Sequence, residues 1–198
     1  MSARLASPGV VSYLAGARIA PVLAAAVIAA VLLPDALAQR LEWQRVPLLA
    51  GEAWRLWTAP FTHHGTAHAA ANAIALLVTG ALAERAAGPG RVAAVLAIAA
   101  LASGLGQLAF MPAMESCRGA SSLAWALAGL ALWAGPAGGL PFVRWALAGL
   151  AVVKFWLEMT GAPGATLPEG VAVAWAGHAA GFACGIALAP ASPATRSA

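Results

Sequence analysis

Residues 66–85 read TAHAAANAIALLVTGALAER, an apolar stretch with two polar side chains, His68 and Asn72, near its start. About 20 apolar residues cross the hydrocarbon core of a bilayer as a helix. A polar side chain inside such a span is costly to place there and usually marks function. The stretch therefore predicts a membrane helix that carries part of a functional site.

The whole chain has the composition of a membrane protein. Of its 198 residues, 62% are hydrophobic and 9% are charged, and the mean hydropathy is +0.81. Soluble domains average about 25% charged residues. The lysines and arginines do not form the basic face or stripe that nucleic-acid binding needs. We expect the lipid bilayer, and no nucleic acid, as a partner.

The apolar runs predict an all-α membrane protein, a six-helix bundle that forms a single domain over residues 1–198. The approximate helix ranges are 17–38, 66–85, 92–111, 119–135, 141–160 and 171–189, and a semi-polar interfacial loop covers 39–65. Residues 36–38, Ala-Leu-Ala, resemble a signal-peptidase site, but the first run is long enough to span and we expect it to be retained. A modest positive-inside bias of the arginines places the N-terminus in the cytoplasm. The fourth and sixth helices then both begin at the outer side.

Two side chains at those helix starts could carry out acyl transfer. Ser121 follows Gly119 and Ala120, and backbone N–H groups in the first turn of a helix can bind an oxyanion. Simple N-capping is the alternative. His178 lies in a Gly-x-x-x-Gly-x-x-x-Gly pattern over 177–185, which lets helices approach closely and lets a base reach its nucleophile. We expect a Ser–His dyad, since no Asp or Glu is placed to orient the ring, and Trp125 is a candidate to stack on it.

His68 and Asn72 are spaced i, i+4, so they share one helix face and could both donate hydrogen bonds to an oxyanion. An interhelical hydrogen bond is the alternative. His63, His64 and His68 also raise the question of a metal site. Because no His-Glu-x-x-His motif and no carboxylate at ligand spacing occurs among them, we expect no metal and no cofactor.

Lys154 and Glu158 are likewise spaced i, i+4, inside the predicted fifth helix. Burying either charge alone would be expensive. Two interpretations are open: the pair neutralises itself, or it holds a polar segment of a substrate.

Together these residues resemble the rhomboid intramembrane serine proteases. The resemblance covers residues 42–189 and is carried by Trp54-Arg55, by His63, His68 and Asn72, by Glu84 at the end of the second helix, by Gly119-Ala120-Ser121, and by His178 with Gly181. It implies that Ser121 is the nucleophile and His178 the general base. It also implies an oxyanion hole of His68, Asn72 and the Ser121 amide, with Trp54 and Arg55 supporting the loop. Ser122 replaces the glycine usual after the nucleophile, and Trp125 stands where tyrosine is frequent.

Within that family the chain is most similar to the rhombosortases, on the lead-in LEWQR (41–45), the compact size and the Lys154–Glu158 pair. That branch implies substrates that are exported bacterial proteins with a C-terminal Gly-Gly tail, one hydrophobic helix and a basic end. It also implies the bacterial inner membrane, with the site opening to the extracytoplasmic side, and either hydrolysis or transfer to an amine. The alternatives are a rhomboid protease with other transmembrane substrates, a catalytically inactive client-binding protein, and a small transporter.

Overall fold

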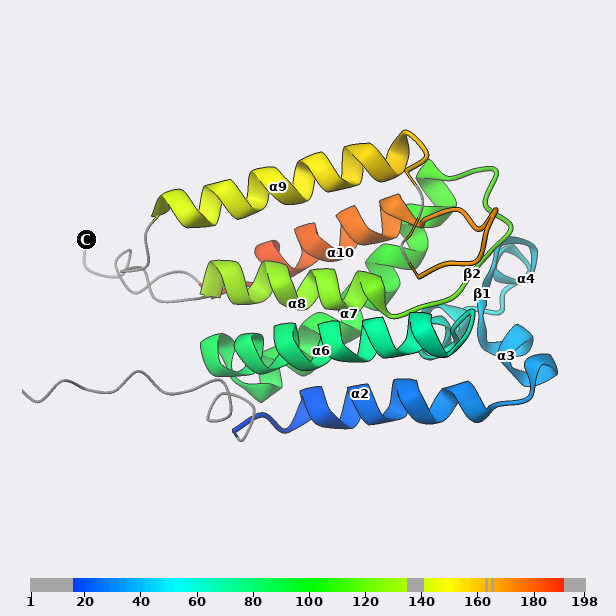
Figure 1. Cartoon of the computed structure of the whole chain (residues 1–198), viewed down its shortest axis with the longest axis horizontal. Helices are drawn as coiled ribbons and strands as arrows, with labels where there is room; N and C mark the ends of the chain where they lie inside the picture. Colours follow the sequence, from blue (N-terminus) through cyan, green and yellow to red (C-terminus); the bar gives the residue numbers. More distant parts are fainter. Residues whose placement is uncertain (1–15, 135–140, 163, 165, 191–198) are drawn as a thin grey trace, which may run out of the picture.

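The computed structural model describes residues 16–134, 141–162, 164 and 166–190, and most of these residues are helical (Figure 1). The six longest helices are α2 (Ile19–Ala29), α6 (Thr66–Ala87), α7 (Pro89–Phe110), α8 (Ser121–Ala134), α9 (Pro141–Met159) and α10 (Trp175–Ala187). The shorter elements are η1 (Ala30–Leu32), α3 (Asp35–Leu41), α4 (Arg45–Leu49), α5 (Arg55–Thr58), η2 (Ala59–Phe61), β1 (Trp43–Gln44) and β2 (Ser116–Cys117). A helix therefore lies in each of the six predicted ranges, and a short antiparallel β1–β2 pair is added to them.

Length and apolar composition mark two of these helices as membrane spans. Within the described residues, α6 and α7 are long and apolar enough to cross a bilayer, and the segments Ile19–Leu32 and Ser121–Ala134 are shorter apolar helices. Two apolar spans are thus clear, and the predicted count of six is not established by this criterion.

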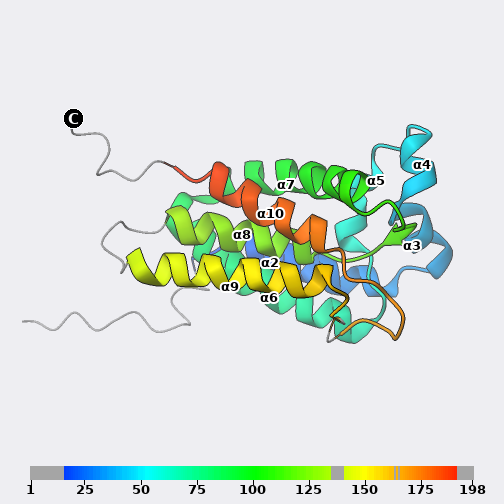
Figure 2. The ribbon, with the colours of Figure 1, turned by 90° about the horizontal axis from the view of Figure 1, so that it is seen from above.

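Helix α8 lies at the centre of the bundle, where it contacts α6, α7 and α10, while α2 packs on α6. Helix α10 lies between α7 and α9 and contacts both (Figure 2). Helices α6, α8 and α10 begin at the end of the bundle where α9 ends (Figure 1). The candidate residues at these helix ends are therefore brought to one level.

Small residues let α8 and α10 approach closely. Gly181 and Gly185 of α10 lie directly against backbone carbonyls of α8, and a Cβ at Gly129 of α8 would lie 2.5 Å from the carbonyl oxygen of Phe182 in α10. Glycine removes the side chain that would otherwise separate two helix backbones. Gly181 and Gly185 thus set the distance between the two helices that carry Ser121 and His178, whereas Gly177 lies against Gln107 of α7.

The first predicted helix is interrupted. Helix α2 continues through η1 only to Leu32, and Asp35 begins the separate helix α3 after Pro34. Proline has no N–H to donate and pushes the preceding residue out of the helical region. The prediction of one helix over 17–38 is therefore wrong. The interfacial loop predicted over 39–65 is also more ordered than expected, since it contains β1, α4, α5 and η2.

The starts of three other helices differ from the predicted ranges, and the first of these, α7, begins at Pro89 and not at 92. Gly119 has a φ of +123°, outside the helical region, so α8 begins at Ser121 and not at 119. Helix α10 begins at Trp175 and not at 171, and Val171, Ala172, Val173 and Ala174 line a cavity instead.

Glu84 fixes the beginning of α2 from a different helix. Its carboxylate accepts the backbone N–H groups of Arg18 at 2.7 Å, Ile19 at 3.0 Å and Ala20 at 2.8 Å. The first N–H groups of a helix have no partner inside it and carry partial positive charge, so a carboxylate is a favourable acceptor. Glu84 therefore ties the N-terminus of α2 to α6.

Candidate active site

The structure brings Ser121 and His178 together. Ser121 is the first residue of α8, and its Oγ lies 2.7 Å from Nε2 of His178, in the first turn of α10. His178 is buried, while Ser121 is partly exposed to a cavity of about 230 Å³. Ser122 is buried and lines a separate, much smaller cavity. The arrangement has the geometry of a nucleophile beside its base.

The other ring nitrogen of His178 has a carboxylate partner. Oε2 of Glu158 lies 2.8 Å from Nδ1 of His178, and the two side chains are only 6% and 8% exposed. The expectation that no acid orients the ring is therefore wrong, and the site contains more than a dyad. Sequence reasoning missed this contact, although the position of Glu158 was a signal for it. Glu158 lies at the end of α9, at the level where α10 begins, so its side chain is close in depth to His178.

Lys154 forms an ion pair with the second oxygen of the same carboxylate, Oε1 of Glu158. The predicted pairing of these two residues is thus present. The side chain of Lys154 is 49% exposed, whereas that of Glu158 is buried. The four groups form a continuous chain of polar contacts from Ser121 through His178 and Glu158 to Lys154.

His68 and Asn72 line the same cavity as Ser121 and His178, and both are buried. The amide of Asn72 donates a hydrogen bond to the carbonyl of His68 at 3.0 Å, within α6. A Cβ at Gly119 would lie 2.9 Å from Nε2 of His68 and 3.7 Å from Nδ2 of Asn72. These donors therefore lie against the backbone that leads into Ser121.

His63 and His64 flank His68. The ring centroids of His63 and His68 are 5.0 Å apart in an edge arrangement, and those of His64 and His68 are stacked at 5.8 Å. Burial, with a contribution from His68, lowers the pKa of His63 to about 4, and burial also lowers the pKa of His64. No group of three or more His, Cys, Asp or Glu side chains among the described residues is arranged to hold a metal ion.

Arg118 is a charged neighbour of the site that the sequence did not reveal. It lines the cavity from the loop before Ser121, forms an ion pair with Glu42, and donates a hydrogen bond to Oδ1 of Asp35 at 3.1 Å. Burial lowers the pKa of Arg118, but the hydrogen bonds and charges of Glu42 and Asp35 together outweigh it and raise the pKa overall. The pairing of β1 with β2 holds the same loop.

Arg55 holds the segment that carries Glu42. It is buried, and it donates hydrogen bonds to Oε2 of Glu52 at 2.7 Å and to the carbonyls of Gln39 and Glu42 at 2.9 Å each. Trp54 leaves 52% of its surface exposed. The side chain of Trp54 therefore points to the surface, and that of Arg55 points into the protein.

Trp125 does not stack on His178. The two ring centroids are 6.5 Å apart and the rings are tilted by 42°. Trp125 instead packs edge-on against Phe155 at 4.9 Å and Phe182 at 5.9 Å, and Nζ of Lys154 lies 6.0 Å from its ring centroid. Trp125 therefore belongs to an aromatic cluster that packs α8 against α9 and α10.

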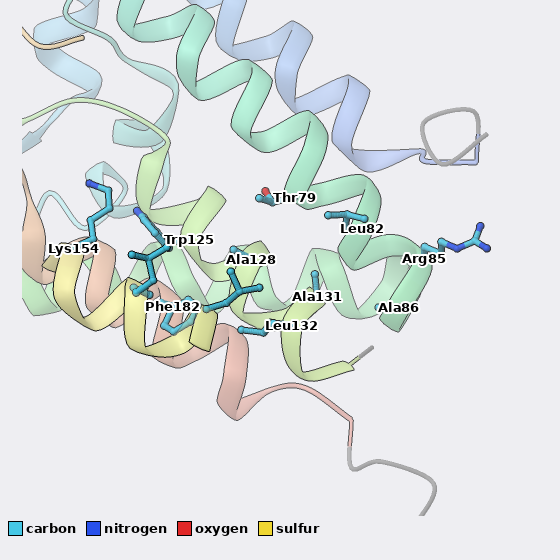
Figure 3. A pocket seen from close by; sticks show the side chains of 13 residues that line it. Thr79, Leu82, Arg85, Ala86, Trp125, Ala128, Ala131, Leu132, Lys154 and Phe182 are labelled. Carbon is cyan, nitrogen blue, oxygen red and sulfur yellow. The ribbon is translucent and has the colours of Figure 1, made fainter. Parts of the chain in front are cut away.

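A second, larger cavity of about 750 Å³ opens between α6, α8 and α9, and its lining is mostly apolar (Figure 3). Trp125 and Lys154 line both this groove and the cavity that contains Ser121. Figure 3 shows these two side chains at one end of the groove and Arg85 at the other. The groove therefore adjoins the cavity that contains Ser121 at these two residues.

The fold and the site define a helical membrane protein in which a serine at a helix start is hydrogen-bonded to a buried histidine. The rhomboid domain model matches residues 50–192, so the chain belongs to the rhomboid family, whose members are intramembrane serine proteases. The matched range includes every residue of the Ser121 cavity. No curated protein matches the chain at a significant level.

Proposed function

We propose that this protein is an intramembrane serine endopeptidase in which Ser121 attacks a peptide carbonyl and His178 is the general base. The observation that carries the proposal is the 2.7 Å contact between Oγ of Ser121 and Nε2 of His178, in a cavity of a rhomboid-family chain. A base within hydrogen-bond reach of a hydroxyl can take its proton as the hydroxyl attacks.

The proton and bond changes follow from this geometry. Oγ of Ser121 forms a bond to the carbonyl carbon while its proton passes to Nε2 of His178. The amide of Ser121, the amide group of Asn72 and the ring of His68 stabilise the negative oxygen. Collapse of this intermediate breaks the C–N bond, and His178 gives its proton to the departing nitrogen. Water then releases the acyl group by the same steps, or an amine accepts it.

The substrate we propose is a membrane-anchored exported protein with a Gly-Gly sequence before a C-terminal hydrophobic helix. Six crossings with a cytoplasmic N-terminus would place Ser121 near the extracytoplasmic surface of a bacterial inner membrane. The apolar groove suits a hydrophobic helix, and Trp125 and Lys154 line both this groove and the Ser121 cavity. Glycines weaken a helix, so a Gly-Gly sequence would expose a carbonyl that a closed helix hides.

A fluorophosphonate probe on the protein purified in detergent micelles tests the nucleophile. We expect the wild type to be labelled, Ser121→Ala to be unlabelled, and the matched neighbour variant Ser122→Ala to be labelled. If Ser122→Ala loses labelling while Ser121→Ala keeps it, the nucleophile is Ser122 and the assignment of Ser121 is wrong. A folded wild type that never reacts would favour a client-binding protein.

Co-expression with a tailed candidate substrate tests the substrate class. We expect a new C-terminus near the Gly-Gly sequence, absent with Ser121→Ala and reduced when Gly-Gly is replaced by Ala-Ala. Mass analysis of that C-terminus separates a free carboxylate, which means hydrolysis, from an amide, which means transfer to an amine. If the Ala-Ala substrate and an unrelated transmembrane protein are cleaved as well as the Gly-Gly substrate, the proposed requirement for a Gly-Gly tail is wrong and the enzyme has a broader specificity.

A further inference from the structure

The two ring nitrogens of His178 have different partners. Nε2 lies 2.7 Å from Oγ of Ser121, and Nδ1 lies 2.8 Å from Oε2 of Glu158. To accept the serine proton, Nε2 must be the nitrogen without hydrogen, so Nδ1 must carry it. An ionised carboxylate only accepts hydrogen bonds, so Glu158 favours this tautomer as long as it is charged. A protonated Glu158 could donate to Nδ1 and would favour the opposite, unproductive tautomer.

Lys154 lies where it can keep Glu158 charged. Its ammonium pairs with Oε1, the carboxylate oxygen that does not contact His178. A lysine and a glutamate that only neutralised each other would need no third partner. Here the carboxylate reaches from α9 to α10, across 20 positions of sequence, and its second oxygen is the partner of the candidate base.

We propose that Glu158 is a positioning residue for His178, completing a Ser121–His178–Glu158 triad, and that Lys154 keeps its carboxylate ionised. The inference rests on the proposed function, because it assigns how the base of that reaction is prepared. When Ser121 transfers its proton, His178 becomes a cation beside the anionic Glu158. The proton stays on the imidazole until the leaving nitrogen takes it, and Glu158 stays ionised throughout.

No other residue that lines the cavity in the described part of the chain could act as the carboxylate that orients His178. Among the described residues that line the cavity, Glu158 is the only carboxylic acid. From α8 the neighbours are Ser121 and the uncharged Trp125, and from α9 the charged neighbour is Lys154. Across the cavity the titratable or cationic groups are His64, His68 and Arg118. His64 is uncharged near neutral pH and Arg118 is paired with Glu42 and Asp35, so Lys154 is the cation in direct contact with Glu158 that favours its ionised form.

The test is the rate of fluorophosphonate labelling against pH, measured on full-length protein in micelles. We expect Glu158→Gln to label Ser121 about 100-fold or more slowly than wild type, because replacing the carboxylate that orients a catalytic histidine by an amide costs at least this much in other serine hydrolases. The matched control Glu169→Gln removes an exposed carboxylate from the loop after α9 and should label at the wild-type rate. Lys154→Met should move the pH profile upward, because Glu158 then loses its proton less readily, and Lys154→Arg should restore it.

The outcomes separate the two proposals. If the wild type labels at Ser121 and a folded Glu158→Gln labels equally fast, the triad is overturned and the endopeptidase proposal stands. If the wild type does not label, both proposals fail. An unshifted pH profile in Lys154→Met overturns the role of Lys154.

A measurement on the wild type avoids any question of whether Glu158→Gln folds. Nitrogen-15 spectra of histidine-labelled protein, with the His178 signals assigned by their loss in His178→Asn, report which ring nitrogen carries hydrogen. We expect hydrogen on Nδ1 and none on Nε2 at neutral pH. Hydrogen on Nε2 would overturn the proposal.

Discussion

Glu84→Gln tests how strongly a single carboxylate holds α2 to the bundle. The substitution keeps the shape of the side chain and one oxygen, but it replaces Oε2 by an NH₂ group that faces the N–H of Arg18. The acceptor of that hydrogen bond is lost. The two N–H groups that bond to Oε1, those of Ile19 and Ala20, keep an acceptor that no longer carries charge.

The magnitude follows from these three bonds. A hydrogen bond to a charged group contributes about 1.5–3 kcal/mol and a neutral one about 1 kcal/mol. Loss of the hydrogen bond from Arg18, together with loss of the acceptor's charge in the bonds from Ile19 and Ala20, thus lowers the free energy of unfolding by about 4 kcal/mol. Loss of the negative charge at the helix N-terminus lowers it by about 0.5 kcal/mol more. Relaxation of the chain would return part of this, so we expect a decrease of about 3–4 kcal/mol in the free energy of unfolding.

The assay is equilibrium unfolding in mixed detergent micelles, followed by circular dichroism, with hydrogen exchange to locate the change. Exchange should accelerate at residues 18–20 before it does elsewhere. Glu169→Gln is the matched control, because that carboxylate is exposed and surface substitutions change stability by about 0.5 kcal/mol or less. A Glu84→Gln protein within 1 kcal/mol of wild type would refute the reasoning about this cap.

Three further predictions concern glycine packing and a partly buried histidine. Gly119→Ala should abolish fluorophosphonate labelling, because φ is +123° and the added Cβ would lie 2.9 Å from Nε2 of His68; labelling at the wild-type rate would contradict this. Gly185→Ala should lower the free energy of unfolding by about 1–3 kcal/mol through overpacking against α8, whereas Gly149→Ala, with open space around it, should not. The pKa of His63 falls from 6.5 to about 4 on folding, so the neutral form is favoured in the folded protein. The contribution of neutral His63 to stability is complete above pH 6.5 and is lost as the pH falls toward 4. The melting temperature of His63→Phe should therefore fall less over this pH range than that of wild type. An equal fall in both proteins would refute this prediction.

Much of the architecture could be predicted from the pattern of apolar runs. Each predicted range contains a helix, because long apolar stretches separated by Gly and Pro leave few alternatives in a bilayer. The approach of Ser121 to His178 followed from two local signals, a serine at a helix start and a small-residue face over 177–185. Both depend on spacing along a single helix, which a sequence displays directly.

The contact between Glu158 and His178 could not be obtained in the same way. Spacing within α9 predicts that Glu158 meets Lys154, but the rotation and tilt of α9 against α10 decide which side chain of the next helix it reaches. The same limit applies to Arg118 and Glu42, which pair across 76 positions. Helix starts were missed where backbone conformation decides them, as at Gly119, whose positive φ no composition reveals.

The position of Glu158 on α9 couples the placement of that helix to the chemistry of the imidazole. Helix α9 forms one side of the groove, and it packs on α10 through the cluster of Ala151, Phe155 and Phe182. A shift of about 0.7 Å would lengthen the 2.8 Å contact of Glu158 with His178 to about 3.5 Å, the limit of a hydrogen bond. A molecule bound in the groove that moved α9 away from α10 would therefore break the contact between Glu158 and His178. Return of α9 to its original position would restore it.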